Sequence, residues 1–306
     1  MRLIRGVREM GEAARAWRGG GRRVGLVPTM GALHAGHMSL LARARSDCDM
    51  RVVSLFVNPS QFGPGEDFEH YPRPFEADAE ACRAAGVDCL FAPEPHDIYP
   101  AGFCSWVEPG EAAKRFEGEI RPGHFRGVAT VVLKLLVTVQ PHVAVFGQKD
   151  AQQIAVLRRM VEDLGLPVAI VAAPTVREED GLAISSRNRY LGPEERRSAP
   201  ALYAALRAAA ALYAGGERAA AALKEAMRRS LAAAPAFIVD YAEVVGAADF
   251  RPAQAADDAS LLIVAGRLGS TRLIDNLPLG ARAGAPDAAT PAPAGASGRT
   301  RPHGRR

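Results

Sequence analysis

Residues 23–37 read RVGLVPTMGALHAGH, and they join a short apolar run to a glycine-containing turn with two histidines. The run 23–28 is typical of a strand that is buried on both faces, as in a parallel sheet. We expect a helix to begin near His37, so the segment predicts a strand, a turn and a helix in succession. Ligands of parallel sheets bind beyond the carboxyl ends of the strands, which makes this turn the first candidate site.

Similar apolar runs recur along the first half of the chain and alternate with helical patterns. Further strand-like runs occupy residues 51–57, 87–92, 142–146 and 167–172. Within 128–139 and 154–164, apolar residues recur every three or four positions, which is the period of an amphipathic helix. We therefore predict an α/β fold with a Rossmann-like parallel sheet that carries helices on both faces.

The second half of the chain has a different pattern, typical of a smaller C-terminal α+β domain. Helices are predicted over 193–214 and 217–234, and strands over 237–245, 260–265 and 271–274. We place the domains at 1–175, 176–281 and 282–306. The last is a tail rich in Arg, Pro and Ala, and we expect it to be disordered because it has little apolar surface to bury.

Composition limits the classes of function. Of the 306 residues, 48% are hydrophobic and 24% are charged, which excludes a wholly disordered protein. The net charge of +4 arises in the tail, where five arginines stand against one aspartate, so the rest of the chain is neutral overall. We therefore expect no nucleic acid partner for the folded body. A nucleic-acid-binding tail is an alternative, but the tail has no aromatic residues on which bases could stack.

The sequence also bears on the compartment. It shows no secretory signal, and its longest apolar run, 128–139, is interrupted by Lys134 and is too short to span a bilayer. The four cysteines have no C-x-x-C spacing, which disfavours a redox or zinc site. We expect a cytoplasmic protein with unpaired thiols and no membrane partner.

His34 and His37 lie three residues apart on the first turn, so both rings can face one ligand. The helix that follows offers free N–H groups and a partial positive charge, which suit a phosphate. Gly31 and Gly36 would let the backbone approach that ligand closely. The alternatives are two ordinary loop histidines or a zinc site, and zinc would need further ligands. A Walker A loop and a G-x-G-x-x-G turn are both absent from the sequence, which argues against P-loop and nicotinamide-dinucleotide chemistry.

A rare lysine marks the turn after another predicted strand. The chain has only four lysines, and Lys149 falls in FGQKDAQQ, residues 146–153. Lysine is a compact point charge, so beside Asp150 it suits a phosphate or a metal-bridged phosphate. The alternative is an exposed lysine at a helix start. Gln152 and Gln153 are adjacent, so we expect one to face a ligand and the other to lie on the surface.

Two more segments carry polar side chains at places where strands or domains end. Asn58 and Gln61, in FVNPSQF at 56–62, are neutral amides that could fix a small polar ligand, although Asn58 also suits a turn. Ser185, Ser186 and Arg187, in VREEDGLAISSRNRYL at 176–191, form a hydroxyl and guanidinium cluster. This cluster could close over a nucleotide or cap the next helix.

Taken in order, these motifs resemble the pantoate–β-alanine ligase family of the HIGH-motif nucleotidyltransferase superfamily. The resemblance covers residues 1–279 and rests on PTMGALHAGH, FVNPSQFGPGEDFEHYPR, RPGHFRGVATVV, FGQKDAQQ, REEDGLAISSRN and STRLIDN. HAGH stands where the superfamily has HIGH, and ISSRN resembles the segment that closes over ATP. The departures are Ile184, where the family more often has Met, and Gln148, where it often has Glu.

The resemblance implies an ATP-dependent ligase that condenses pantoate with β-alanine to pantothenate through pantoyl adenylate, with release of AMP and pyrophosphate. It implies that 1–175 binds ATP and pantoate and that 176–281 acts as a lid. It further implies Mg²⁺ as cofactor, with Asp150 in its shell, and a homodimer.

The site residues that the resemblance implies fall into four sets. The catalytic residues are His34, His37, Lys149 and Arg187. The ATP-binding residues are Met30, Gly31, Ala32, Leu33, His34, Ala35, Gly36, His37, Gly147, Gln148, Lys149, Asp150, Val176, Ile184, Ser185, Ser186 and Arg187. Pantoate is bound by Gln61 and Gln153, and β-alanine by Gln61 and Asn58.

Within the superfamily, the alternative is a nucleotidyltransferase that moves AMP or CMP onto a phosphorylated small molecule. Such an enzyme would need a cationic acceptor site, whereas the segment opposite the histidines offers the neutral amides Asn58 and Gln61. A class I aminoacyl-tRNA synthetase is less consistent with a neutral body that is too short for a tRNA-binding domain. The sequence leaves open whether RPGHF, residues 121–125, is a mobile flap or a plain loop.

Overall fold

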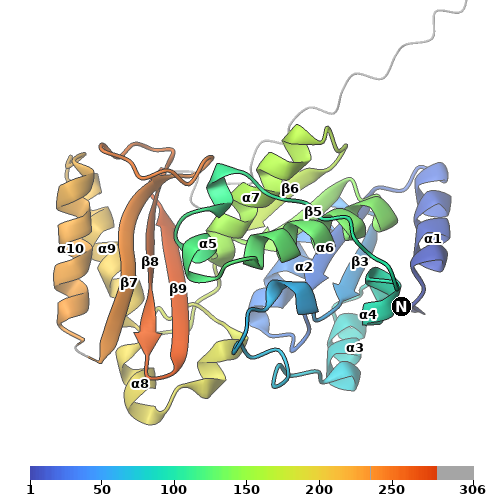
Figure 1. The fold of residues 1–306 in the computed structure, drawn as a ribbon, viewed down its shortest axis with the longest axis horizontal. Coiled ribbons are helices and arrows are strands. Elements are labelled where there is room, and N and C mark those ends of the chain that lie inside the picture. The colour runs from blue at the N-terminus through green and yellow to red at the C-terminus, as the bar shows by residue number, and fades with distance from the viewer. Residues whose placement is uncertain (235, 281–306) are drawn as a thin grey trace, which may run out of the picture.

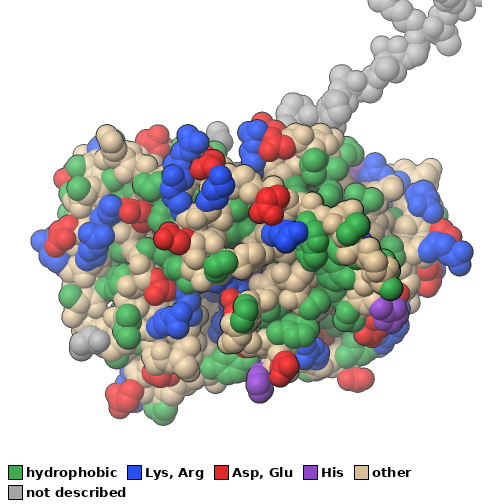
Figure 2. Space-filling view, viewed as in Figure 1, with side chains coloured by type: hydrophobic (Ala, Val, Ile, Leu, Met, Phe, Trp, Pro, Cys, Tyr) green, Lys and Arg blue, Asp and Glu red, His purple; other side chains and the backbone are tan. Residues whose placement is uncertain are grey.

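A computed structural model describes residues 1–234 and 236–280, which form two sheets flanked by helices (Figure 1). The predicted tail 282–306 lies outside the described residues. None of the helices formed by the described residues is long and apolar enough to cross a membrane. On the face drawn in Figure 2, acidic and basic side chains are interspersed.

The larger sheet has six parallel strands in the order β1-β4-β3-β2-β5-β6. The strands are β1 (Arg2–Ile4), β2 (Val24–Thr29), β3 (Met50–Leu55), β4 (Cys89–Phe91), β5 (Val143–Gly147) and β6 (Ala169–Ala173). From β2 the chain proceeds outward through β3 and β4, whereas β5 and β6 lie on the other side of β2. The direction of winding therefore reverses between β2 and β5, and such a switch point is where ligands bind in open α/β sheets.

Helices cover both faces of this sheet, as the apolar runs predicted. One face packs against α1 (Val7–Gly19), α6 (His124–Val139) and α7 (Ala151–Asp163). The other face packs against α2 (Ala35–Asp47) and α3 (Phe75–Ala84). Successive strand residues alternate between the two cores, because side chains along a strand point to opposite faces. Leu26 belongs to the first core, for example, and Val27 to the second.

The smaller sheet is antiparallel and consists of β7 (Phe237–Gly246), β8 (Ser260–Leu268) and β9 (Thr271–Pro278). It packs against α9 (Ala201–Ala214) and α10 (Ala220–Ala232), which follow the short α8 (Pro193–Ser198). The six-stranded sheet with its helices is called the first unit below, and the smaller sheet with its helices the second unit. A separate hydrophobic cluster joins the two units, because Val245 and Ile263 pack with Ala151 and Ala155 of α7. This contact brings the second sheet alongside the start of α7.

Short elements fill the connections. They are η1 (Pro59–Gln61), α4 (Pro95–Ile98), η2 (Glu111–Ala113), α5 (Glu117–Ile120), η3 (Gln148–Asp150) and η4 (Ser186–Tyr190). The predicted α/β fold with a smaller α+β unit is confirmed, whereas the division at residue 175 stays a prediction.

Some elements differ from the sequence-based expectation. Strand β1 and helix α1 were not predicted. Helix α10 begins at Ala220 instead of residue 217, because the Glu217 carboxylate accepts the N–H groups of Arg218 at 2.8 Å and Ala219 at 2.7 Å. Strand β9 runs on to Pro278, because its register against β8 continues as far as Leu261.

Candidate active site

A cavity of about 250 Å³ lies at the switch point, beyond the carboxyl ends of β2 and β5. It brings together residues from five segments that are far apart in the sequence. The predicted site residues that line it are Met30, His34, Gly36, His37, Asn58, Gln61, Gly147, Lys149, Asp150, Gln153, Val176, Ile184, Ser185, Ser186 and Arg187. Gly31, Ala32, Leu33, Ala35 and Gln148 do not line it.

His34 and His37 are held by the start of helix α2. The Nδ1 atom of His34 accepts the N–H of Gly36 at 3.1 Å, and the Nδ1 atom of His37 accepts the N–H of His34 at 3.3 Å. A backbone N–H can only donate, so in the neutral rings the proton lies on Nε2. Each imidazole is thereby left with an Nε2–H donor for a ligand, and the ring centroids are 4.1 Å apart.

Both imidazoles favour the neutral form. Burial, and after it the positive charges of Lys149 and Arg189, lower the pKa of His34. Burial and the neighbouring His34 lower the pKa of His37 to about 3. The two rings therefore act as neutral hydrogen-bond donors at pH 7, and their contribution to an anion site comes from directed N–H groups.

The turn between β2 and α2 is held by a buried carboxylate on α3. Asp78, which is 3% exposed, accepts the N–H groups of Ala32 at 2.9 Å and Leu33 at 2.8 Å. Ala32 and Leu33 were predicted to lie along the ATP site, whereas in the structure their backbone amides bind Asp78 inside the protein. Nothing in the sequence of the turn points to Asp78 as its partner, because Asp78 lies more than forty residues further along the chain.

The glycines of this turn have contacts inside the protein. Gly31 has a φ of 91°, and a Cβ atom there would lie 2.9 Å from the Asp78 carboxylate. A Cβ atom at Gly36 would lie 2.9 Å from the His34 ring. Both positions therefore need glycine so that the turn can accept Asp78 and the imidazole.

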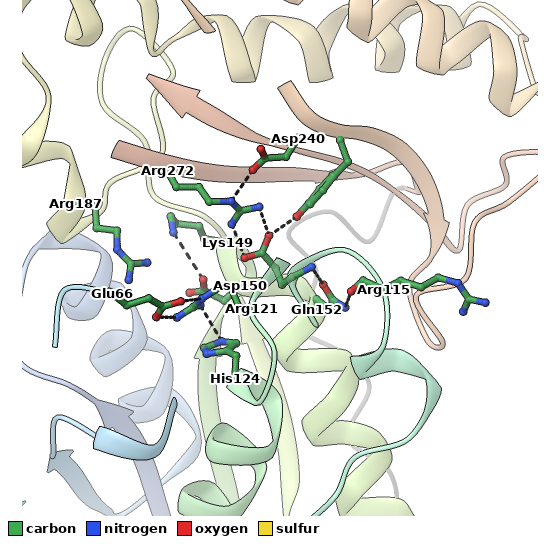
Figure 3. A network of polar contacts seen from close by, with 12 residues as sticks. Glu66, Arg115, Arg121, His124, Lys149, Asp150, Gln152, Arg187, Asp240 and Arg272 are labelled. Carbon is green, nitrogen blue, oxygen red and sulfur yellow. Dashed lines mark hydrogen bonds and ion pairs between the residues drawn. The ribbon is translucent and has the colours of Figure 1, made fainter. Parts of the chain in front are cut away.

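Lys149 reaches the cavity from η3, directly after β5. Its side chain is 21% exposed, and its Nζ atom lies 3.7 Å from the carboxylate of Asp150 (Figure 3). Its charge contributes to the lowered pKa of His34, so the ammonium and the imidazole share one electrostatic environment. The neighbouring Gln148 turns away, because its Nε2 atom donates to the Oδ1 atom of Asn276 on β9.

The adjacent side chains of Gln152 and Gln153 lie in different surroundings, and the sequence predicted these surroundings only in part. Gln153 lines the cavity. The expectation that its neighbour lies on the surface is wrong, because Gln152 is 4% exposed. Its side chain accepts the N–H of Glu117 and donates to the carbonyl groups of Ala112 and Arg115. Gln152 therefore ties the segment 112–117 to helix α7.

Asn58 is buried and holds Gln61 in place. Its Nδ2 atom donates to the Gln61 side chain at 3.0 Å and to the carbonyl of Gly127 at 3.2 Å. Its Oδ1 atom accepts the hydroxyl of Tyr99 at 2.7 Å. A Cβ atom on Gly127 would lie 2.2 Å from the Ser60 carbonyl, so glycine there allows α6 to approach η1. Gln61 itself lines the cavity, together with an apolar wall that includes Val128 and Val131 of α6.

Arg121 and His124 also line the cavity, and sequence reasoning did not identify them as site residues. Arg121 forms a two-fold ion pair with Glu66, and its Nη1 atom lies 3.1 Å from Nε2 of His124 (Figure 3). The Nδ1 atom of His124 lies 2.9 Å from the Gln61 carbonyl, which requires the proton on Nδ1. Burial and the Arg121 charge lower the pKa of His124 to about 4. The sequence signal that could have identified these two residues is the Arg-Pro-Gly-His motif at positions 121–124.

The segment after β6 closes one side of the cavity. The Ser185 hydroxyl accepts the N–H of Arg187 at 3.3 Å, so this serine caps η4. Arg187 pairs with Asp67 at 3.1 Å. Burial opposes its charge, but the hydrogen bonds and charge of Asp67 outweigh burial and raise the pKa of Arg187. The guanidinium is thus charged and lies at the cavity wall.

The side chains around the cavity could bind magnesium only together with the phosphates of a bound nucleotide. Among the described residues, no three His, Cys, Asp or Glu side chains are grouped so as to hold a metal ion. Asp150, with its side chain 48% exposed, is the carboxylate beside Lys149. Magnesium is commonly bound through one or two carboxylates together with substrate phosphates, so one such carboxylate is compatible with it.

The fold and the cavity define a class: an α/β enzyme of the doubly wound type, with two imidazoles and a lysine at its switch point. Residues 2–278 match the family model described as "Pantoate-beta-alanine ligase". The chain belongs to this family. The predictions of the family, of the α/β fold and of an amide-forming, ATP-dependent ligase are thereby confirmed.

Relatives match almost the whole chain. A protein named "Pantothenate synthetase" from Geobacter sulfurreducens is 49% identical over 280 residues, which are 92% of this chain and 99% of that protein. "Pantothenate synthetase 1" from Bradyrhizobium diazoefficiens is 53% identical over 280 residues, or 91% and 98% of the two chains.

Two solved structures are similar in fold and sequence. Pantothenate synthetase from Thermus thermophilus gives a TM-score of 0.86 at 48% identity and covers 92% of this chain and 100% of its own. Pantoate-beta-alanine ligase from Francisella tularensis, complexed with beta-gamma ATP and beta-alanine, gives a TM-score of 0.74 at 32% identity. It covers 91% of this chain and 98% of its own.

Proposed function

We propose that the cavity at the switch point adenylates pantoate with ATP and then joins the pantoyl group to β-alanine. The observation that carries this proposal is the convergence of His34, His37 and Lys149 on one cavity that also has an apolar wall and three side-chain amides. Three N–H donors suit a polyphosphate, and the apolar wall suits the branched carbon skeleton of pantoate.

In the first step, a pantoate carboxylate oxygen attacks the α-phosphorus of ATP, and pyrophosphate leaves. The Nε2–H groups of His34 and His37 donate to phosphate oxygens, and Lys149 supplies a full positive charge. Positioning and charge stabilisation carry most of this step, because little covalent chemistry falls to the protein. Arg187, with Ser185 and Ser186, contacts the phosphates from the segment after β6.

In the second step, the amine of β-alanine attacks the pantoyl carbonyl carbon, the nitrogen loses a proton, and AMP leaves. Gln61 and Gln153 hold the pantoyl group through their amides. Gln61 also lies near the amine. Asn58 was predicted to contact β-alanine, but its hydrogen bonds to Gln61, Gly127 and Tyr99 support a role in fixing Gln61.

Magnesium would be held together with the ATP phosphates by Asp150, a carboxylate that lines the cavity beside Lys149. The ion would neutralise negative charge on the triphosphate when bound. We further propose that the unit after residue 175 serves as a lid, and that the protein acts as a homodimer in the cytoplasm. Light scattering of the purified chain tests the dimer.

Exchange of labelled pyrophosphate into ATP tests the proposed first step. Exchange should depend on pantoate when a panel of small hydroxy acids is compared. AMP release should follow only when β-alanine is added. Exchange that does not depend on pantoate, or a stable dinucleotide product with a phosphorylated acceptor, would favour the nucleotidyltransferase alternative.

A further inference from the structure

The STRLIDN motif, residues 270–276, forms most of strand β9 and has no part in the chemistry described above. Side chains alternate along a strand, so Arg272, Ile274 and Asn276 share one face. That face meets the first unit, because Ile274 and Asn276 line a small cavity of about 40 Å³ with Lys149 and Gln153. Leu273, on the opposite face, belongs to the core under α9 and α10.

Asn276 binds the backbone of the loop that carries Lys149. Its Nδ2 atom donates to the carbonyl groups of Gln148 and Lys149, each at 2.9 Å. Its Oδ1 atom accepts from the Gln148 side chain at 3.0 Å. The side chain is 3% exposed, and both of its N–H groups and its oxygen are used.

The Lys149 loop has no side-chain cap of its own. Neither Gly147, which precedes η3, nor Asp150, which precedes α7, makes a side-chain capping hydrogen bond. A lysine side chain is long and has many rotamers, so the position of its ammonium depends on where the backbone holds its Cα atom. Asn276 fixes the carbonyl of Lys149 itself.

Asn276 is in turn held by its own strand. Asp275, 4% exposed, forms a two-fold ion pair with Arg177 at 2.6 and 3.0 Å. The Arg177 guanidinium lies over the Tyr203 ring of α9 at 3.7 Å. Strand β9 is therefore a rigid support on which a single amide can set the geometry of the loop.

We infer that Asn276 is a positioning residue for the adenylation step, which acts by holding the Lys149 ammonium against the nucleotide phosphates. This inference rests on the proposed role of Lys149. It assigns a kinetic role to the second unit, whose strand β9 reaches the loop from 127 residues away.

The test compares Asn276→Asp, Lys149→Met and the double variant in pantoate-dependent pyrophosphate exchange. Asn276→Asp keeps the shape but points a carboxylate at two carbonyl groups. It should lower kcat for exchange roughly tenfold to a hundredfold and leave KM for pantoate unchanged, since a small displacement of a catalytic group has effects of this size. In the Lys149→Met background, the same change should cost less than about twofold, because the group that it positions is gone.

Thr271→Val is the matched control. Thr271 lies on the same strand, is 5% exposed, and its Oγ1 atom has no hydrogen-bond partner among the described residues. This variant should retain wild-type exchange. If Asn276→Asp does not fold, as judged by thermal unfolding, Asn276→Ala carries the same test without a new charge.

Wild-type kcat in the folded Asn276 variant, or full additivity with Lys149→Met, would overturn the inference. A wild-type rate in Lys149→Met alone would instead overturn the proposed role of Lys149, so the two failures are distinguishable.

Discussion

The two loops that meet at the cavity are held in different ways. The turn after β2 is fixed by its own residues, through the His34 and His37 rings, and by Asp78 of a helix on the same sheet. The loop after β5 is fixed by Asn276, which belongs to the second sheet. Contacts within the first unit thus orient the imidazoles, whereas contacts between the two units place the lysine.

This difference separates two ways of disturbing the site. A change near β2 should alter the histidine turn alone. A change in β9 should reach Lys149 without any contact with substrate. It follows that the second unit can influence adenylation through the loop after β5, even though none of its strands lines the larger cavity.

The largest expected effect tests whether both loops take part in the chemistry. His37→Ala and Lys149→Ala should each slow pyrophosphate exchange roughly a hundredfold, or by ~3 kcal/mol in transition-state stabilisation, because each removes one directed donor. Thermal unfolding should show that both variants remain folded. Near wild-type exchange in either variant would break the comparison, since one loop would then have no part in the reaction.

The next largest effect concerns a second contact between β9 and the first unit, at Glu117 of α5. Glu117, 6% exposed, binds Arg272 at 2.6 and 2.7 Å and the Tyr241 hydroxyl at 2.8 Å. Burial opposes its charge, but Arg272 outweighs burial and lowers the pKa of the Glu117 carboxyl. Glu117→Gln should lower the free energy of unfolding by about 2 kcal/mol, since it weakens charged hydrogen bonds.

Glu111→Gln is the control for this prediction. Glu111 lies in the same segment and pairs with Lys114 on the surface, with its side chain 50% exposed. Its loss should change the stability in chemical denaturation far less than Glu117→Gln does, because solvent screens an exposed ion pair. Equal effects of the two variants would show that the contact with β9 adds nothing to the stability of this segment.

A smaller effect is expected in the turn after β2. Asp78→Asn keeps one acceptor oxygen but places an amide NH₂ against a backbone N–H. It should lower the free energy of unfolding by about 1.5 kcal/mol and reduce exchange, because the histidine turn loses one charged hydrogen bond. Glu76→Gln, at an exposed position in the same helix, is the control. Loss of stability without any loss of exchange would mean that the turn does not depend on Asp78 for its geometry.

The last prediction concerns the dependence of the histidine turn on pH. The pKa of His37 is lowered to about 3 in the folded state from 6.5. Between these values the unfolded chain binds more protons, so the contribution of His37 to stability falls as the pH is lowered through this window. Ring NMR signals of His37 should show no titration from about pH 8 to about pH 5, assigned by their loss in His37→Ala. A midpoint near neutrality would contradict the buried, neutral ring.

The sequence predicted most of the fold because apolar periodicity is a local signal. Five of the six parallel strands coincide with runs of apolar residues in the sequence. Strand β1 has only three residues, and two of them are exposed. The same signal found the candidate residues on the loops after β2 and β5. It missed Arg121 and His124, because they lie between and at the start of helices and do not follow a strand. It placed Gln152 on the surface, because adjacent residues on a helix diverge and nothing local showed a second partner.

By itself, the sequence determined the parallel sheet, the turn with its two histidines and the rare lysine, since each depends on residues close together in the chain. Only the tertiary structure decided that Asp78 occupies the amides of Ala32 and Leu33, and that Asn276 holds the Lys149 loop. The physical reason is that such contacts depend on strand register and on the packing of one unit against another. No periodicity within either segment specifies which distant side chain will arrive beside it.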